Sequence, residues 1–291
     1  MHQSPRSASH HVAFFQQLQR SGFIEGQNLL VDTHGYGLHV AQLSEHVAAV
    51  VKAGVDVILC GGDLAARAAQ QATKTIPILV ITDDMLGSRL VGSLAKPEGN
   101  TTGISILATE LDAKRQEILI EAVPGIRRIA ALADSNTTAP RQLQALQEAA
   151  LARGVEVLIH RVARPEEIAD AIGKAQASGA VALNVLATPL LFNARKIILE
   201  RVAALRLPTM YQWPETTEEG GLIGYGPRLA QLYRDIMARQ LIKLLLGAKP
   251  ADVPVEQPTK FELIINLKTA RALGLTIPHA LLSRADELLD S

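Results

Sequence analysis

The feature that most constrains this chain is a pattern of short apolar runs and amphipathic helices that occurs in both halves. One copy is GVDVILCGGDLAARAAQQATKTIPILVITDD, from Gly54, and the other is GAVALNVLATPLLFNARKIILERVAALRLPTMYQWPE, from Gly179. Each predicts a strand, a tight turn, a helix, an Ile-Pro or Leu-Pro step, a second strand and a polar turn. Strands that alternate with helices are typical of parallel α/β sheets. The repeat therefore predicts two lobes of like topology.

The remaining sequence extends this alternation along the chain. We expect strands at 28–33, 55–60, 76–82, 128–133, 155–160, 180–186, 208–212 and 261–267. We expect helices at 11–21, 38–53, 63–73, 109–122, 138–153, 165–177, 189–205, 229–246 and 267–275.

Composition and motif content exclude several classes of protein. Lysine plus arginine (29) balances aspartate plus glutamate (29) in 291 residues, so the chain lacks the basic footprint of a nucleic-acid binder. Cys60 is the only cysteine, and no HxxxH or HExxH spacing occurs on a predicted helix, so we expect neither a disulfide nor a metal site. GxSxG, GxxxxGK[ST] and GxGxxG are also absent from the sequence. We therefore expect neither an enzyme nor a bound cofactor.

The loops in which a ligand would bind follow from the predicted topology. Open α/β sheets bind ligands beyond the carboxyl ends of their strands. In the first lobe these loops provide Gly61, Gly62, Asp63, Thr82, Asp83 and Asp84. In the second they provide Asp134, Ser135, Asn136 and Pro189. His10 is a further candidate, with a cap or surface role as the alternative.

Each of these loops also has a purely structural interpretation. Gly61, Gly62 and Asp63 open a helix whose backbone N–H groups suit a carboxylate, or they form a turn with Asp63 as an N-cap. Asp83 and Asp84 suit a ligand ammonium, or they cap the next helix. The DSNTT segment from Asp134 is a ligand clamp or a cap.

Aromatic residues make up only 3% of the chain, and three of the five Tyr and Trp residues lie close together near the end of the repeat. Tyr211, Trp213 and Tyr225 could stack on a ligand and orient it through an O–H or N–H group. The alternative for each is packing in the core or at a hinge.

Several segments, in this order and spacing, resemble the substrate-binding proteins of one ABC transporter family. They are GFIEGQNL from Gly22, LVGSLAKPEGNTTGIS from Leu90, AKRQEILIEAVPGIRRIAAL from Ala113, GGLIGYGP from Gly220 and PADVPVEQPTKFELIINLKTARALGLTIPHALLSRADELL from Pro250. Characterised members of the family take up aromatic amino acids. The resemblance implies an extracytoplasmic protein that captures a small ligand, an aromatic amino acid or similar carboxylate, and presents it to membrane permease subunits.

The same resemblance implies a type I periplasmic-binding fold, in which two Rossmann-like lobes are joined by three crossovers and close on the ligand by hinge motion. The lobes would comprise residues 1–103 with 226–257, and residues 104–225 with 258–291. The crossovers would lie near 100–104, 223–226 and 255–260. In this scheme Asp83 or Asp84 pairs with the ammonium, Gly61 and Ser135–Asn136 hold the carboxylate, and Tyr211 or Trp213 forms an aromatic wall.

The N-terminal segment departs from the family pattern. Members begin with an export signal or lipid anchor and an apolar first strand, whereas MHQSPRSASHH contains neither. We therefore expect residues 1–9 not to form a strand and the first strand to be missing. A mature form, a misplaced start and a cytoplasmic relative are the alternatives, the last being a small-molecule sensor like the effector domains of lac-repressor-type regulators.

Overall fold

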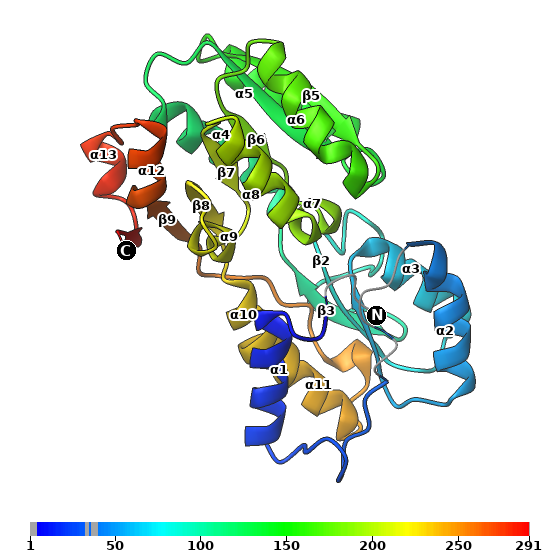
Figure 1. The fold of residues 1–291 in the computed structure, drawn as a ribbon. Coiled ribbons are helices and arrows are strands. Elements are labelled where there is room, and N and C mark those ends of the chain that lie inside the picture. Colours follow the sequence, from blue (N-terminus) through cyan, green and yellow to red (C-terminus); the bar gives the residue numbers. More distant parts are fainter. Residues whose placement is uncertain (1–4, 33–34, 36–39, 291) are drawn as a thin grey trace. The chain divides into compact units, whose positions relative to one another are not determined.

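A computed structural model describes residues 5–32, 35 and 40–290 of the protein. The chain divides into two compact units: unit 1 contains residues 1–107 and 229–259, and unit 2 contains residues 108–228 and 260–291 (Figure 1). The chain therefore passes between the units after residues 107, 228 and 259. The first two passages follow shortly after the segments near which crossovers were expected, 100–104 and 223–226, which pair as strands β3 (Thr101–Ser105) and β8 (Ile223–Gly226). The third lies within the expected range 255–260.

Unit 1 contains a parallel sheet with the strand order β1-β2-β3. Its first part contains α1 (Ser9–Arg20), α2 (Leu43–Lys52), β1 (Ile58–Gly61), α3 (Asp63–Ala72), β2 (Ile78–Thr82) and β3. Its second part is one continuous helical segment made of α10 (Leu229–Gln231), a π-helix (Leu232–Met237) and α11 (Ala238–Leu245). Residues 38 and 39, at the start of the helix expected at 38–53, lie outside the described residues.

The strand expected at 28–33 was wrong over its described residues. Leu29 makes an isolated bridge with Glu25, residues 30–32 are irregular, and Leu30 is 92% exposed. Thr33 lies outside the described residues. Residues 5–8 form a turn ahead of α1, in line with the expectation that this segment is not a strand, and residues 1–4 lie outside the described ones.

Unit 2 contains a seven-stranded sheet with the order β10-β9-β8-β7-β6-β4-β5. Within it, β5-β4-β6-β7-β8 is the 2-1-3-4-5 order of a doubly wound fold, and all these strands are parallel. Strand β9 is antiparallel to β8. The strands are β4 (Arg128–Asp134), β5 (Glu156–Val162), β6 (Leu183–Val185), β7 (Thr209–Tyr211), β8, β9 (Glu262–Asn266) and β10 (Glu287–Leu289). The α-helices are α4 (Ala108–Ala122), α5 (Pro140–Leu151), α6 (Ile168–Ala177), α7 (Pro189–Asn193), α8 (Arg195–Ala204), α9 (Pro214–Glu218), α12 (Leu267–Leu273) and α13 (His279–Leu282).

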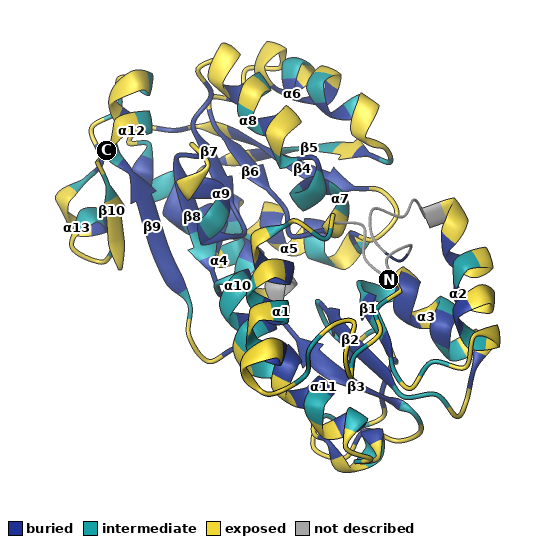
Figure 2. Cartoon of the chain, turned by 60° about the horizontal axis from the view of Figure 1, so that its bottom comes forward, coloured by how far each residue is buried: buried dark blue, intermediate teal, exposed yellow. Residues whose placement is uncertain are grey.

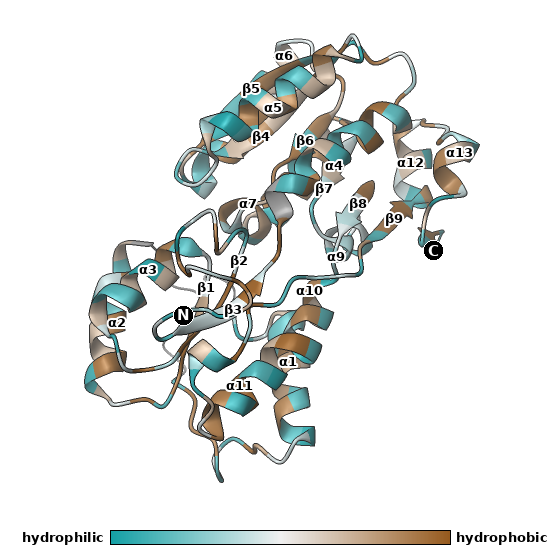
Figure 3. Cartoon of the chain, turned by 180° about the vertical axis from the view of Figure 1, so that it is seen from behind, coloured by the Kyte–Doolittle hydropathy of each residue, from teal (hydrophilic) through white to brown (hydrophobic). Residues whose placement is uncertain are grey.

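The core of unit 2 lies on both faces of its sheet. Along β4, Ile129 and Ala131 pack in one apolar cluster, and Ala130 and Leu132 pack in another. This alternation follows from the two-residue period of a strand and requires helices on both faces. Figure 2 shows buried strands beneath helices whose outer sides are exposed, and in Figure 3 strand β9 is mainly hydrophobic. No helix among the described residues has the length and apolar character needed to cross a bilayer.

The core of unit 1 contains the single cysteine of the chain. Cys60 on β1 is fully buried among Ile78, Val80 and the alanines of α3, as expected for a small apolar side chain. Burial raises the pKa of its thiol to about 11.

Helix α1 packs on the π-helix of unit 1 through an aromatic cluster. The rings of His10, His11 and Phe14 lie 4.7, 5.4 and 6.1 Å from the ring of Tyr233. His11 is 1% exposed, and its Nδ1 lies 2.9 Å from the Pro5 carbonyl. Burial disfavours the imidazolium and lowers the pKa of His11 to about 4.

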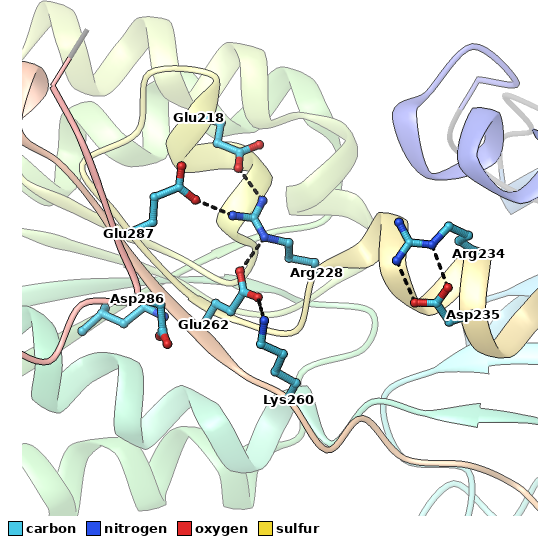
Figure 4. A network of polar contacts seen from close by, with 9 residues as sticks. Glu218, Arg228, Arg234, Asp235, Lys260, Glu262, Asp286 and Glu287 are labelled. Carbon is cyan, nitrogen blue, oxygen red and sulfur yellow. Dashed lines mark hydrogen bonds and ion pairs between the residues drawn. The ribbon is translucent and has the colours of Figure 1, made fainter.

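Two charged residues of unit 2 lie at the positions where the chain leaves and re-enters it. Arg228 pairs with Glu218, Glu262 and Glu287, the last at 2.7 Å (Figure 4). Lys260 pairs with the second oxygen of Glu262. Burial opposes ionisation of Glu262, but hydrogen bonds from Lys260 and Arg228 outweigh it and lower the pKa of this carboxyl. The network links α9, β9 and β10 to the segment that leaves unit 2 at Arg228 and to the segment that re-enters it at Lys260.

We expect His11 to make unfolding strongly pH-dependent. Its pKa is lower in the folded than in the unfolded state, so the folded protein binds fewer protons between pH 6.5 and 4. Stability from this group is present above pH 6.5 and falls by up to about 3 kcal/mol as the pH drops to 4. Denaturant unfolding of the wild type and His11→Gln should give different slopes against pH, while a control substitution at the exposed His279 keeps the wild-type slope. Parallel curves for His11→Gln and the wild type would contradict this.

Candidate functional site

In unit 1, the turn between β1 and α3 is held by hydrogen bonds to the neighbouring strand. Gly62 adopts φ 88° and ψ 161°, a conformation that favours glycine, and its N–H donates to the Ile81 carbonyl at 2.8 Å. The carboxylate of Asp63 accepts hydrogen bonds from the hydroxyls of Thr82 and Ser88. Gly61, Gly62, Asp63 and Thr82 are thus brought together at the carboxyl ends of β1 and β2.

The two adjacent acids after β2 have different surroundings. The side chain of Asp84 accepts hydrogen bonds from the N–H groups of Leu86 at 3.1 Å and Gly87 at 2.8 Å, and so closes its own turn. Asp83 is half-buried, and its carbonyl accepts a bond from the Leu107 N–H at 2.8 Å. The backbone of Asp83 is thus fixed at the end of β2, and the Asp84 carboxylate shapes the turn that follows.

In unit 2, the loop after β4 has a buried carboxylate at its base. Asp134 is 3% exposed and accepts bonds from the Asn136 N–H at 2.8 Å and the Thr137 hydroxyl at 3.0 Å. Asn136 also donates to the Ala163 carbonyl at 3.1 Å. Ser135 and Asn136 are exposed. Asp134 thus shapes the loop, and its two neighbours face solvent.

The loops after β6 and β7 are linked by a residue that sequence reasoning missed. Thr188 caps α7 by accepting a bond from the Leu191 N–H at 3.2 Å, and Pro189 is exposed in the first turn. The side chain of Gln212, immediately after β7, donates to the Thr188 carbonyl at 3.3 Å. Pro189 is therefore coupled to the turn that carries Trp213.

The candidate aromatic residues differ in accessibility. Tyr211 is 2% exposed in an apolar cluster of unit 2, where burial raises the pKa of its hydroxyl. Trp213 is 6% exposed, and its ring lies edge-on to Phe192 with 6.0 Å between centroids. Tyr225 is half-buried, with its ring 6.4 Å from that of Phe261. His10 lies in unit 1, within the helix packing around Tyr233.

A buried ion pair beneath the unit 2 loops was also missed. Asp112 and Arg115 on α4 are both 0% exposed, and Arg115 Nη1 lies 2.8 Å from Asp112 Oδ1. The signal was present in the sequence, since positions 112 and 115 share a helical face with the core residues Leu119 and Ala122. Charged residues on an apolar stripe indicate a buried polar network.

The arrangement favours binding of a small polar molecule. Backbone turns and short polar side chains gather at the carboxyl edges of two α/β units, and in unit 2 they are accompanied by the half-buried ring of Tyr225. Among the described residues no group of three His, Cys, Asp or Glu side chains could hold a metal ion. Two α/β units between which the chain passes three times are the layout of a type I periplasmic-binding fold.

Comparison with known proteins identifies the family. Residues 7–289 match the ABC transporter substrate binding protein family, so the chain belongs to it. As expected from the motif content, this is a family of solute-binding proteins and not of enzymes, and its members are typically extracytoplasmic.

Individual relatives agree in sequence and fold. The chain is 25% identical over 268 residues to a tyrosine-binding protein of Clostridioides difficile (strain R20291), covering 90% of this chain and 75% of that protein. It is similar in fold to an ABC domain in complex with L-Trp from Streptococcus pneumonia, with a TM-score of 0.85 and 24% identity over 98% and 96% of the two chains. A conserved domain protein of Vibrio cholerae has the same TM-score and identity over 96% and 94% of the chains.

We expect Asp134→Ala to destabilise the protein through its loop. The substitution removes the acceptor for the Asn136 and Thr137 donors, and a lost hydrogen-bond set of this kind costs about 1–3 kcal/mol. Denaturant unfolding should show the loss. Ser135→Ala, which changes an exposed hydroxyl in the same loop, should stay within about 0.5 kcal/mol of wild type. Equal stability of the two variants would contradict the bracing role of Asp134.

Proposed function

We propose that this protein captures an aromatic amino acid, or a similar small carboxylate, outside the cytoplasm and delivers it to the permease subunits of an ABC transporter. The observation that carries the proposal is the set of polar turns at the carboxyl edge of each unit in a member of a substrate-binding family. The tyrosine-binding relative and the L-Trp complex of a protein with the same fold support the choice of ligand class.

In this proposal the ligand ammonium pairs with Asp83. Asp83 is half-buried, and its carbonyl accepts a hydrogen bond from the Leu107 N–H group. This fixed position supports the role. Asp84, which is also half-buried, is the second candidate in the same turn. A buried or half-buried carboxylate attracts a cation more strongly than an exposed one, since solvent screens it less.

The ligand carboxylate is assigned to backbone and amide donors. The first turn of α3, after Gly61 and Gly62, offers N–H groups with the positive end of the helix dipole. Ser135 and Asn136 are exposed on the turn that Asp134 braces. Trp213 and Tyr225 are assigned to the ligand ring. Tyr211 is assigned to support of this wall, because its ring lies in the core.

We expect free aromatic amino acids to raise the melting temperature. A ligand that binds only the folded state at 100 times its Kd stabilises it by about 2.7 kcal/mol. A thermal-shift series with L-Tyr, L-Phe, L-Trp and L-Leu should show stabilisation by aromatic members. Analogues without the ammonium or without the carboxylate should stabilise much less. Equal stabilisation by an amine and its parent amino acid would refute the carboxylate assignment.

We expect Asp83→Asn to weaken binding of the amino acid at least tenfold, since a charge-assisted hydrogen bond contributes about 1.5–3 kcal/mol. Isothermal titration calorimetry measures the change. Asp56→Asn, an exposed acid of the same unit, is the matched control and should bind like the wild type. Unchanged affinity of Asp83→Asn, with full binding by the wild type, would remove Asp83 from the site.

A further inference from the structure

The guanidinium of Arg115 lies beneath the turn that carries Trp213. Its Nε donates to the Tyr225 carbonyl at 2.7 Å, and its Nη2 lies 3.4 Å from the Gln212 carbonyl. These acceptors follow Arg115 by 110 and 97 residues in the sequence. One fully buried side chain on α4 thus holds two separate backbone segments, the turn after β7 and strand β8.

The carboxylate of Asp112 orients this guanidinium. Asp112 Oδ1 accepts a bond from Arg115, and Oδ2 accepts one from Gln142 Nε2 on α5 at 2.6 Å. A guanidinium has five donors in a fixed plane, so a carboxylate on one side determines where the other donors point. The pair therefore acts as a rigid support and not only as a source of charge neutrality.

The supported backbone segments are closely packed. A Cβ added at Gly226 would lie 2.2 Å from the Gln212 carbonyl oxygen and 3.3 Å from Arg115 Nη2. Strand β8 and the turn after β7 therefore touch through their main chains at the guanidinium. A lysine ammonium, a single point of donation, cannot reproduce both contacts in this plane.

We infer that Arg115 is a positioning residue that sets the affinity of the protein for its ligand by fixing the turn of Gln212 and Trp213 and the backbone of Tyr225. The inference rests on the proposed function, in which the two aromatic residues contact the ligand ring. Gln212 also donates to the Thr188 carbonyl, so a displaced turn would shift the loop of Pro189.

Trp213 provides a direct readout, because it is the only tryptophan of the chain. Its emission spectrum in the ligand-free protein reports the environment of the turn. The test compares the wild type, Arg115→Lys and Gln142→Ala, with Ile172→Ala as the control. Ile172 is buried in the core of unit 2 on α6, so its truncation lowers stability without touching the network. Affinity for L-Tyr is measured by calorimetry at a temperature where each variant is folded.

We expect Arg115→Lys to shift the Trp213 emission to longer wavelength and to weaken L-Tyr binding by roughly tenfold or more, since small displacements of positioned groups have effects of that size. Gln142→Ala should change both readouts in the same direction by less, and carries the test if Arg115→Lys does not fold. Ile172→Ala should lower the melting temperature while leaving emission and affinity unchanged.

Unchanged emission and affinity in Arg115→Lys, with only a lower melting temperature, would overturn the inference and leave a structural ion pair. A shifted emission with unchanged affinity would overturn it as well, because the turn would then move without consequence for the ligand. If the wild type binds none of the amino acids, the proposed function fails, and unchanged emission in the variants still refutes the positioning role.

Discussion

The carboxyl edge of unit 2 depends on burial of one guanidinium. Burying a charged group is costly unless its partners satisfy it, and loss of one partner of a buried pair costs about 3–5 kcal/mol. Arg115 meets this condition with Asp112 and two main-chain carbonyls. The charge is thereby stabilised by the same backbone segments that it holds in place. The packing of α4 and the geometry of the carboxyl edge therefore depend on the same bonds of Arg115.

Three of the four glycines of the GGLIGYGP segment, Gly221, Gly224 and Gly226, follow from this close packing. A Cβ at Gly224 would lie 2.8 Å from the Trp213 carbonyl oxygen, and one at Gly221 would lie 2.7 Å from the ring of Tyr211. Gly103 in β3 of unit 1 shows the same constraint, because its Cβ would lie 1.8 Å from the Val80 carbonyl. In each unit, close main-chain packing thus occurs at the last strand before the chain leaves.

Strands were predictable where a neighbouring strand exists to pair with them. The runs at 128–133 and 155–160 became β4 and β5, which pair along their whole length. The run at 28–33 has a similar apolar character, but its described residues do not form a strand. In the 2-1-3-4-5 order the second strand pairs only with the first, as β5 does with β4. Among the described residues of unit 1 no strand occupies the position of β4, so residues 28–32 have no ladder to join.

The positions of the polar turns could be predicted, but the hydrogen bonds that their side chains make could not. The alternation of strands and helices is enough to place the polar turns at the carboxyl edge. The alternation does not show that the carboxylates of Asp84 and Asp134 accept hydrogen bonds from nearby donors, because such bonds depend on turn geometry. The helical face of Arg115 indicated its burial, but its acceptors could not be predicted, because they lie about a hundred residues away in the sequence.

The ion pairs around Arg228 extend this reasoning to the unit boundary. Arg228 and Glu262 lie just beyond and at the ends of strands β8 and β9, where Gly226 pairs with Glu262. The chain passes into unit 1 after β8 and returns to unit 2 just before β9. Charge pairing at this point holds the segment that leaves unit 2 and the segment that returns to it beside the antiparallel pair of β8 and β9. Because Arg228 and its partners Glu218 and Glu287 are partly exposed, salt weakens their pairing, whereas the bonds of the buried Arg115 persist.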